Sequence, residues 1–338
     1  MKVLVTGGAG FIGSHTLVEL LAQGHEALVV DDFSNGSPVA LDRVRLLTNR
    51  PVEVEEADIR DTGRLVSILE RWRPEAVIHF AGLKSVGESE RQPVDYWDVN
   101  VGGTTALLRA MDAGGTRKVI FSSSATVYGE PEYLPYDENH PIRPASVYGQ
   151  TKAVAERVLT DWAKATEGAT AILLRYFNPV GAHASARMGE DPRGVPENLM
   201  PFMAQVAAGR RESLRIWGDD WPTPDGTGVR DYIHVTDLAR AHVAAIDHAG
   251  RVTGAHAFNI GTGRGASVRE MLEAFERAVG RSLPHEVHPR RPGDIAEMRA
   301  DCGKALREMG WRAGMGLDDM VGSLWAWQEA NPQGYGER

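Results

Sequence analysis

The stretch VLVTGGAGFIG at positions 3–13 restricts the fold of this 338-residue chain more than any other. An apolar, strand-like run leads into Gly7, Gly10 and Gly13, and a helix is expected over Ser14–Gln23. Glycine permits a tight turn, and it lets a phosphate group approach the free N–H groups at the start of a helix. The loop also contains a G-x-G-x-x-G spacing, which after a strand indicates a nucleotide-binding strand–turn–helix unit.

Other short runs of apolar and β-branched residues recur through the first half of the chain. In AVIHF, KVIFSS and AILLRYF the apolar character is continuous rather than alternating, which is typical of parallel strands covered on both faces. We therefore predict an α/β fold with a doubly wound parallel Rossmann sheet. The expected strands are Lys2–Thr6, Glu26–Asp31, Val52–Glu55, Ala76–Phe80, Lys118–Ser122 and Ala171–Tyr176.

The composition of the sequence changes after Asn178, where frequent prolines divide the chain into loops and short elements. This change predicts a cofactor domain over residues 1–178 and a smaller, mainly substrate-binding lobe over residues 179–338. The segment 256–261 is again strand-like, and residues of about 230–262 are compatible with a return to the first domain.

Asp31 stands at the end of the second expected strand. A carboxylate there can accept hydrogen bonds from both ribose hydroxyls of NAD, whereas an NADP enzyme would favour a basic residue. The sequence therefore favours NAD. Asp58, after the third strand, suits either the adenine amino group or the capping of its own loop.

Ser124 ends a central strand, and Tyr148 and Lys152 are four residues apart, so both face the same side of a helix. A tyrosine that acts as a base near neutral pH needs its pKa lowered by roughly three units, about 4 kcal/mol. A unit positive charge about 5 Å away contributes on the order of 3 kcal/mol at an effective dielectric near 20. Lys152 and an oxidised nicotinamide together would suffice.

Composition excludes several other classes of function. The formal net charge of −9 argues against a nucleic-acid track and against an anionic membrane surface. The single Cys302 excludes an internal disulfide and a cysteine zinc cage, and His79, His234 and His242 lack zinc-ligand spacing, so no metal is expected. Without a signal peptide or a long apolar segment, we expect a cytoplasmic protein.

The segments HFAGLKSVGES, FSSSATVYG, SVYGQTK, LRYFNPVGAH, NLMP and DGTGVRDYIHV, together with the glycine loop, resemble the extended short-chain dehydrogenase/reductase family over essentially the whole chain. Within it, they are similar to the members that epimerise UDP-glucose and UDP-galactose at C4. The resemblance implies bound NAD, a UDP-hexose substrate, a transient 4-keto sugar, and a homodimer joined through helices near 96–113 and 148–166.

The resemblance also assigns roles to individual positions. It implies that Ser124, Tyr148 and Lys152 are catalytic. The implied NAD site contains Gly7, Gly10, Phe11, Ile12, Gly13, Asp31, Asp32, Asn35, Asp58, Ile59, Phe80, Ala81, Gly82, Lys84, Asn100, Tyr148, Lys152 and Phe177. The implied UDP-hexose site contains Lys84, Ser124, Tyr148, Asn178, Asn198, Leu199, Arg230, Arg291, Asp294 and Met298.

Some positions leave alternatives open. Phe80 and Phe177 suit the nicotinamide or plain core, and Val99 stands where some relatives carry a second asparagine before Asn100. The resemblance puts Met298 at the position that gates the 2-substituent of the sugar, and the alternative is a core methionine remote from the sugar.

Two rival functions are a sugar-nucleotide dehydratase and an inactive NAD-sensing regulator. The dehydratase would place acids where Ala125 and Thr126 stand, and the regulator would lack Tyr148 or Lys152.

Overall fold

The computed structural model describes residues 1–291 and 293–336, and within them the largest element is a parallel sheet of seven strands. Its order is β10-β6-β5-β4-β1-β2-β3, and every neighbouring pair is parallel. The prediction of a doubly wound parallel sheet is confirmed. The strands are β1 Lys2–Thr6, β2 Glu26–Asp31, β3 Glu53–Glu56, β4 Ala76–His79, β5 Lys118–Ser124, β6 Thr170–Tyr176 and β10 Gly254–Ile260.

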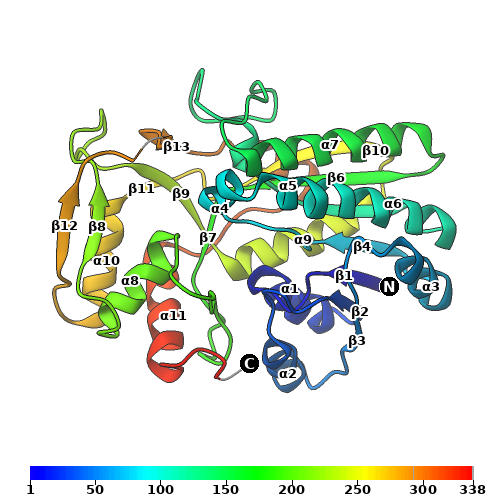
Figure 1. Ribbon diagram of the computed structural model, residues 1–338, viewed down its shortest axis with the longest axis horizontal. Coiled ribbons are helices and arrows are strands. Elements are labelled where there is room, and N and C mark those ends of the chain that lie inside the picture. The colour runs from blue at the N-terminus through cyan, green and yellow to red at the C-terminus, as the bar shows by residue number, and fades with distance from the viewer. Residues whose placement is uncertain (292, 337–338) are drawn as a thin grey trace.

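Helices cover both faces of this sheet (Figure 1). One face carries α1 (Phe11–Ala22), α2 (Pro38–Thr48) and α9 (Val235–Ala249), and the other carries α3 (Thr62–Trp72), α6 (Gly103–Gly114) and α7 (Val147–Ala165). Alternate residues of β1 enter the two cores, because Val3 and Val5 pack on the α1 side and Leu4 on the α3 side. Two short helices, α4 (Val86–Arg91) and α5 (Pro93–Tyr96), and a π-helical turn, η1 (Trp97–Gly102), precede α6.

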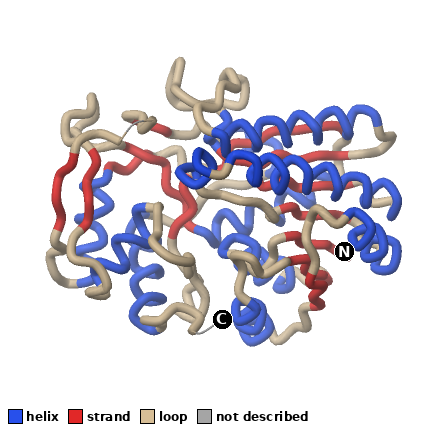
Figure 2. The backbone as a smooth tube through the Cα atoms, viewed as in Figure 1, coloured by secondary structure: helices blue, strands red, loops and turns tan. Residues whose placement is uncertain are grey.

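A second lobe lies beside the carboxyl ends of the strands, and much of it is loop (Figure 2). Its strands are β7 (Asn178–Val180), β9 (Val229–His234), β11 (Gly265–Ser267) and β13 (Glu297–Met298) in one sheet, and β8 (Leu214–Trp217) with β12 (His285–His288) in another. Its helices are α8 (Leu199–Ala207), α10 (Val268–Val279) and α11 (Leu317–Ala330). A separate apolar core joins these helices. Two short helical turns, η2 (Ala125–Val127) after β5 and η3 (Ala305–Met309) beside α9, belong to the part of the chain around the large sheet.

Several element boundaries differ from those predicted. Helix α1 begins at Phe11 rather than Ser14, because the extended Gly10 already serves as its N-cap. Strand β5 continues to Ser124 rather than ending at Ser122, because Ser124 still pairs in register with Tyr176 of β6. Strand β3 is shifted by one residue, β4 stops at His79, and β6 starts at Thr170.

A buried ion pair joins α7 to the centre of the sheet. Glu156 of α7 and Arg175 of β6 lie 2.6 Å apart, and both side chains are more than nine-tenths buried. Ser123 of β5 donates to the Glu156 carboxylate, and Arg175 also donates to the Tyr128 hydroxyl at 3.1 Å. Because the network spans β5, β6 and α7, it fixes the helix against the strand that ends in Ser124. None of the helices in the described ranges is long and apolar enough to span a membrane.

Candidate active site

Most residues of the predicted cofactor site follow the carboxyl ends of strands in the large sheet, where ligands of doubly wound folds bind. The glycine loop follows β1 there. A Cβ atom on Gly13 would lie 2.4 Å from the Gly7 carbonyl oxygen, and one on Gly7, whose φ is +70°, would lie 2.6 Å from the Ala81 nitrogen. In the described chain no side chain caps α1, so its first N–H groups face this edge. The loop therefore fits the diphosphate of a dinucleotide.

Asp31 closes the other side of the loop. Its carboxylate accepts hydrogen bonds from the backbone nitrogens of Ala9 and Phe33, each at 2.9 Å. Burial raises the pKa of Asp31, and these two N–H groups lower it again. A carboxylate held from both sides, with lone pairs remaining, fits a ribose diol. Asp32 instead accepts from Ser34 in a local turn.

Two predicted cofactor residues also have partners within the chain. Asp58 pairs with Arg60, whose interaction lowers the pKa of that carboxyl group, and it accepts from the Arg60 nitrogen within its own loop. The role of Asp58 toward the adenine amino group stays a prediction. Asn100 accepts from the Leu83 nitrogen at 2.8 Å and donates to the Leu83 oxygen and to Thr151. Asn100 thereby holds the segment after β4 against α7.

The remaining residues of the implied cofactor site follow the strand ends. Ile59 is buried in the core beneath Gly103, and Phe80 packs against His242 with ring centroids 4.6 Å apart. Ala81 donates its N–H to the Thr6 carbonyl, and Phe177 is buried beside Tyr136. Gly82 approaches the Asn100 amide and the Lys152 nitrogen. Lys84 forms an ion pair with Glu190, 3.1 Å away.

Tyr148 and Ser124 meet where α7 begins beside the end of β5. The Tyr148 backbone nitrogen donates to the Ser89 hydroxyl at 3.1 Å, which ties the start of α7 to α4. The Ser124 oxygen accepts from the Thr126 hydroxyl at 3.0 Å and from the Thr126 nitrogen. The Ser124 hydroxyl therefore keeps its own proton for donation, and it lies within hydrogen-bonding reach of the Tyr148 phenol. Sequence reasoning missed this role of Thr126, although a threonine two residues after a strand-end serine is a signal for such a turn.

Lys152 lies one helical turn beyond Tyr148 and is buried. Its ammonium donates to the Ser122 carbonyl at 2.8 Å and lies 5.8 Å from the centroid of the Tyr148 ring. Burial lowers the pKa of Lys152 to about 8, and the nearby Glu156 carboxylate opposes that shift. The Lys152 side chain is thus mostly charged at pH 7, and its positive charge favours the ionised form of the Tyr148 phenol.

The pKa of the Tyr148 phenol differs from the ordinary tyrosine value near 10, on which the sequence-based expectation rests. Burial raises the pKa of Tyr148 to about 12, although the Ser124 hydroxyl lowers it. Forming a phenolate at pH 7 then costs about 7 kcal/mol rather than about 4. Lys152 offers about 3 kcal/mol at its observed distance. The chain alone therefore keeps Tyr148 protonated, and a second positive charge beside the ring is required for it to act as a base.

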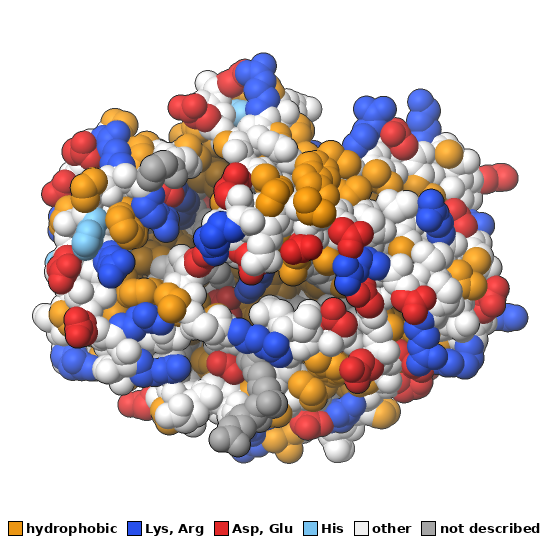
Figure 3. All heavy atoms as spheres, viewed as in Figure 1, with side chains coloured by type: hydrophobic (Ala, Val, Ile, Leu, Met, Phe, Trp, Pro, Cys, Tyr) orange, Lys and Arg blue, Asp and Glu red, His pale blue; other side chains and the backbone are white. Residues whose placement is uncertain are grey.

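The residues assigned to the substrate come mainly from the smaller lobe. Arg230 on β9 pairs in register with Met298 on β13, and Asn178 on β7 pairs with Tyr232 on β9. The surface is hollowed between the two lobes (Figure 3). Asn198 is the N-cap of α8 and does not use its side chain for capping within the described chain, and Leu199 begins that helix.

Two other assigned residues occupy the segment before β13. The Arg291 Nε atom lies 3.0 Å from an Asp294 carboxylate oxygen, so these two side chains pair with each other. The Arg291 guanidinium also lies over the Trp217 ring, with its carbon 5.7 Å from the centroid. Their roles toward a ligand remain predictions.

A group of possible metal ligands lies away from this edge. Among the described residues, His248, His256 and Glu308 bring ligand atoms within 4.8 Å of one another near the start of β10. His79, at the end of β4, is held between the Thr6 and Thr104 hydroxyls, and burial lowers its pKa to about 3. The expectation that the site uses no metal stays a prediction.

Comparisons with known proteins agree on one family. The model of the NAD dependent epimerase/dehydratase family matches residues 3–261. The UDP-glucose 4-epimerase of Mus musculus is 52% identical to this chain, covering 99% of both. The structure of UDP-glucose 4-epimerase from Bifidobacterium longum in complex with NAD+ and UDP has a TM-score of 0.95 at 49% identity, covering 99% of this chain and 100% of that one. The structure of UDP-glucose 4-epimerase from Stenotrophomonas maltophila with bound NAD and formylated UDP-arabinopyranose has a TM-score of 0.96 at 48% identity, covering 98% of this chain and 99% of that one.

The burial of Lys152 predicts a pH-dependent effect of removing it. Its lowered pKa means that the charged form destabilises the folded state by about 3 kcal/mol below pH 8. Between pH 8 and the ordinary lysine value near 10.5 the unfolded state binds the extra proton, so this penalty disappears as pH rises. Urea unfolding of nucleotide-free Lys152→Met and wild type should therefore show the variant gaining stability relative to wild type at pH 7 and losing that gain by pH 10.

The matched control is Lys164→Met, an exposed lysine on the same helix. Its difference from wild type should not follow pH in this way. A Lys152→Met difference that stays constant from pH 7 to pH 10 would contradict the buried charge.

Proposed function

The chain belongs to the NAD dependent epimerase/dehydratase family, and from that premise we propose that it interconverts UDP-glucose and UDP-galactose by inverting C4 of the sugar. The observation that carries the proposal is the burial of Tyr148 and Lys152 on one face of α7, beside Ser124 and at the edge where the glycine loop opens. A base, its positive neighbour and a hydroxyl donor thereby converge where a dinucleotide fits.

Side chains of this chain would remove and return the proton of the sugar 4-hydroxyl. We assign Tyr148 as the base that accepts the proton of the sugar 4-hydroxyl, and as the acid that returns it. Ser124 donates a hydrogen bond to the same sugar oxygen, since its own oxygen already accepts from Thr126. The Lys152 ammonium, held by the Ser122 carbonyl, stabilises the phenolate.

The cofactor site fits NAD, with the glycine loop toward the diphosphate and the Asp31 carboxylate toward a ribose. When bound, NAD supplies the hydride acceptor and donor for C4 and the positive charge that Tyr148 requires. Loss of a hydride from C4 and of a proton from its hydroxyl leaves a 4-keto sugar. Rotation of this sugar about its bond to the diphosphate presents its other face, and reduction from that face inverts C4.

We assign binding of the UDP group to the smaller lobe. The Arg230 and Arg291 guanidiniums are suited to the diphosphate, because their planar donors match phosphate oxygens. Asn178, Asn198, Leu199 and Asp294 are assigned to the uridine, the ribose or the phosphates. We likewise propose that residues 1–178, with about 230–262, form the cofactor domain, that residues 179–338 mainly bind the substrate, and that the enzyme is cytoplasmic.

The rival functions fit less well. A dehydratase needs an acid to expel the C6 hydroxyl, but Ala125 and Thr126 follow the strand-end Ser124, and the Thr126 hydroxyl is committed to Ser124. An inactive regulator would not need to retain both Tyr148 and a buried Lys152, whose charge is unfavourable for folding.

The direct test is to incubate the purified protein with UDP-galactose and no added NAD. We expect UDP-glucose to form, and the protein to carry NAD in preference to NADP. Tyr148→Phe should lower kcat by roughly 100-fold or more, because it removes the base, while UDP affinity stays near that of wild type. The exposed Tyr133→Phe serves as the control and should keep normal turnover. Near-normal kcat in Tyr148→Phe, or turnover only with added NADP, would contradict the proposal.

We propose that Met298 limits the size of the sugar's 2-substituent. It packs against the buried cluster that includes Tyr136, Phe177 and Ala300, where the smaller lobe meets the end of β6. Methionine is unbranched and flexible, so it can move aside for an acetamido group, at a loss of packing.

Substrate breadth should therefore depend on this side chain. We expect wild type to favour UDP-galactose over UDP-N-acetylgalactosamine by roughly 10- to 100-fold in kcat/KM, about 1.4 to 3 kcal/mol. Met298→Ser should narrow the ratio and Met298→Tyr should widen it. If neither substitution changes the ratio, Met298 is not the gate.

We also propose a homodimer joined through η1, α6 and α7, the helices near 96–113 and 148–166, together with the adjoining α5. Val94, Trp97 and Val154 are exposed on these neighbouring elements, and Val94 is 76% exposed. Hydrophobic side chains gather over α5 and α7 in the surface view (Figure 3). A contiguous exposed apolar patch of this kind marks an interaction surface.

Sedimentation equilibrium tests this interface. Wild type should sediment with twice the chain mass, and the double variant Val94→Glu with Trp97→Glu should sediment as a monomer, because two carboxylates would be buried on association. Val287→Glu, at an exposed apolar residue of the smaller lobe, should leave the dimer intact. A dimer that survives the double substitution places the interface elsewhere.

A further inference from the structure

We propose that residues 190–197 form a clasp, reaching from the smaller lobe to both ends of the cofactor site, and that Glu190 and Arg193 are positioning residues that retain the bound dinucleotide. The inference rests on the proposed function, because it assumes that this site holds NAD. The segment reads EDPRGVPE, with prolines at positions 192 and 196. Since proline fixes its own φ, the two rings stiffen the short span between the contacts described below.

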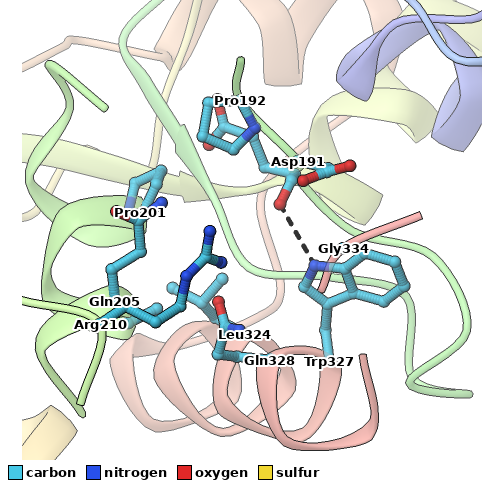
Figure 4. A pocket seen from close by; sticks show the side chains of 11 residues that line it. Asp191, Pro192, Pro201, Gln205, Arg210, Leu324, Trp327, Gln328 and Gly334 are labelled. Atoms are coloured by element: carbon cyan, nitrogen blue, oxygen red, sulfur yellow. Dashed lines mark hydrogen bonds between the residues drawn. The ribbon is translucent and has the colours of Figure 1, made fainter. Parts of the chain in front are cut away.

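The base of the clasp is firmly packed against the end of the chain (Figure 4). The Trp327 indole of α11 donates to the Glu190 carbonyl at 3.2 Å, and the Tyr335 nitrogen donates to the Asp191 carboxylate at 3.0 Å. A Cβ atom on Gly189 would lie 2.5 Å from the Trp327 ring. The cavity beside Pro192 has a volume of only about 10 Å³, room for about one water. The first two residues of the clasp, Glu190 and Asp191, are therefore held in place by the C-terminal segment.

One arm reaches the loop that positions Asp31. The Arg193 guanidinium donates to the Phe33 carbonyl at 2.9 Å and to the Gly36 carbonyl at 3.5 Å. Phe33 has a φ of +54°, which is unfavourable for a residue with a side chain. Its conformation is maintained from one side by the Asp31 carboxylate and from the other by Arg193. Arg193 thus bridges the lobes at the end assigned to the adenosine ribose.

The other arm reaches the segment that follows β4, near Tyr148. Glu190, whose side chain is 8% exposed, forms the ion pair with Lys84. Glu197 accepts a hydrogen bond from the Ser85 hydroxyl, and the Arg91 guanidinium lies 3.6 Å from its carboxylate. The Lys84 segment is itself fixed, because Asn100 holds Leu83 and the Tyr96 hydroxyl accepts from the Ser85 nitrogen.

These contacts connect the clasp to both ends of the cofactor site. Asp31 lies at one end and Tyr148 toward the other, and the glycine loop lies between them along the sheet edge. A dinucleotide seated along this edge can leave only after the lobes separate there, which breaks the contacts of Arg193, Glu190 and Glu197 together. The clasp therefore acts on the rate of release, because each charge-assisted contact must be lost before the nucleotide departs.

The test measures release of NAD from the holoenzyme. Protein purified with its nucleotide is diluted, and NAD in the filtrate is followed with time. We expect release from Arg193→Ala to be roughly tenfold faster than from wild type, as for loss of one charge-assisted hydrogen bond, and Glu190→Gln to be accelerated several-fold. Arg193→Lys should fall between, since lysine keeps the charge without the planar fork.

The matched controls are Arg187→Ala, an exposed arginine just before the clasp, and Glu212→Gln, an exposed acid of the smaller lobe. Both should release NAD at the wild-type rate. Equal release from Arg193→Ala and Arg187→Ala would overturn the inference, even where wild type holds NAD and epimerises its substrate. A wild type that never holds NAD would instead overturn the proposed function.

Trypsin digestion of wild type provides a second measurement that does not depend on how the variants fold. Bound NAD should slow cleavage after Arg193 and leave cleavage after Arg187 in the same digest much less affected. If NAD protects neither bond, or both equally, Arg193 does not belong to a clasp.

Discussion

The ion pair between Glu156 and Arg175 determines where the reactive side chains lie. Tyr148, Lys152 and Glu156 follow one another at four-residue intervals on α7, so a helix fixed at Glu156 presents the other two on the same face. A buried ion pair is weak evidence for stability, but a rotation of α7 would leave both charges unpaired in the interior. The hydrogen bonds from Ser123 and to Tyr128 satisfy the remaining polar atoms. The pair thereby specifies one orientation of the helix against β5 and β6.

That orientation buries Tyr148 and Lys152, and burial disfavours the charged form of each, the phenolate and the ammonium. The Tyr148 phenol is harder to ionise here than in water, and the Lys152 ammonium is easier to deprotonate. Each shift has desolvation as its largest cause. The same desolvation strengthens the attraction between an ammonium and a phenolate once both are formed. Under the proposed mechanism, Tyr148 is therefore a weak base in the chain alone, and we expect the positive charge of an oxidised cofactor to favour removal of its proton.

The sequence predicted local features well and distant pairings poorly. The glycine loop, the parallel strands and the Tyr148–Lys152 spacing depend on neighbours within a few residues or on continuous apolar runs, and the fold confirms the doubly wound sheet. Contacts such as Arg193 with Phe33 and Lys84 with Glu190 join segments more than a hundred residues apart, so no local pattern reveals them. Asn100 is an intermediate case, because its partner Leu83 is 17 residues away, whereas Asp58 pairs with Arg60 only two residues on, as its loop-capping alternative predicted. Apart from β9, the strands of the smaller lobe are only two to four residues long, too short to show an alternating pattern.

The distribution of these long-range contacts suits the proposed reaction, in which the cofactor stays in place while the sugar rotates. The proposed cycle needs the nicotinamide to keep its place while the sugar rotates to show its second face. Ion pairs, stiff prolines and close-packed glycines surround the edge of the large sheet, where the cofactor is assigned. The side assigned to the sugar is lined instead by a flexible methionine on a strand only two residues long, Glu297–Met298. Under the proposed function, we therefore expect the contacts at the sheet edge to hold the cofactor in place, and the unbranched side chain of Met298 to leave the sugar room to turn.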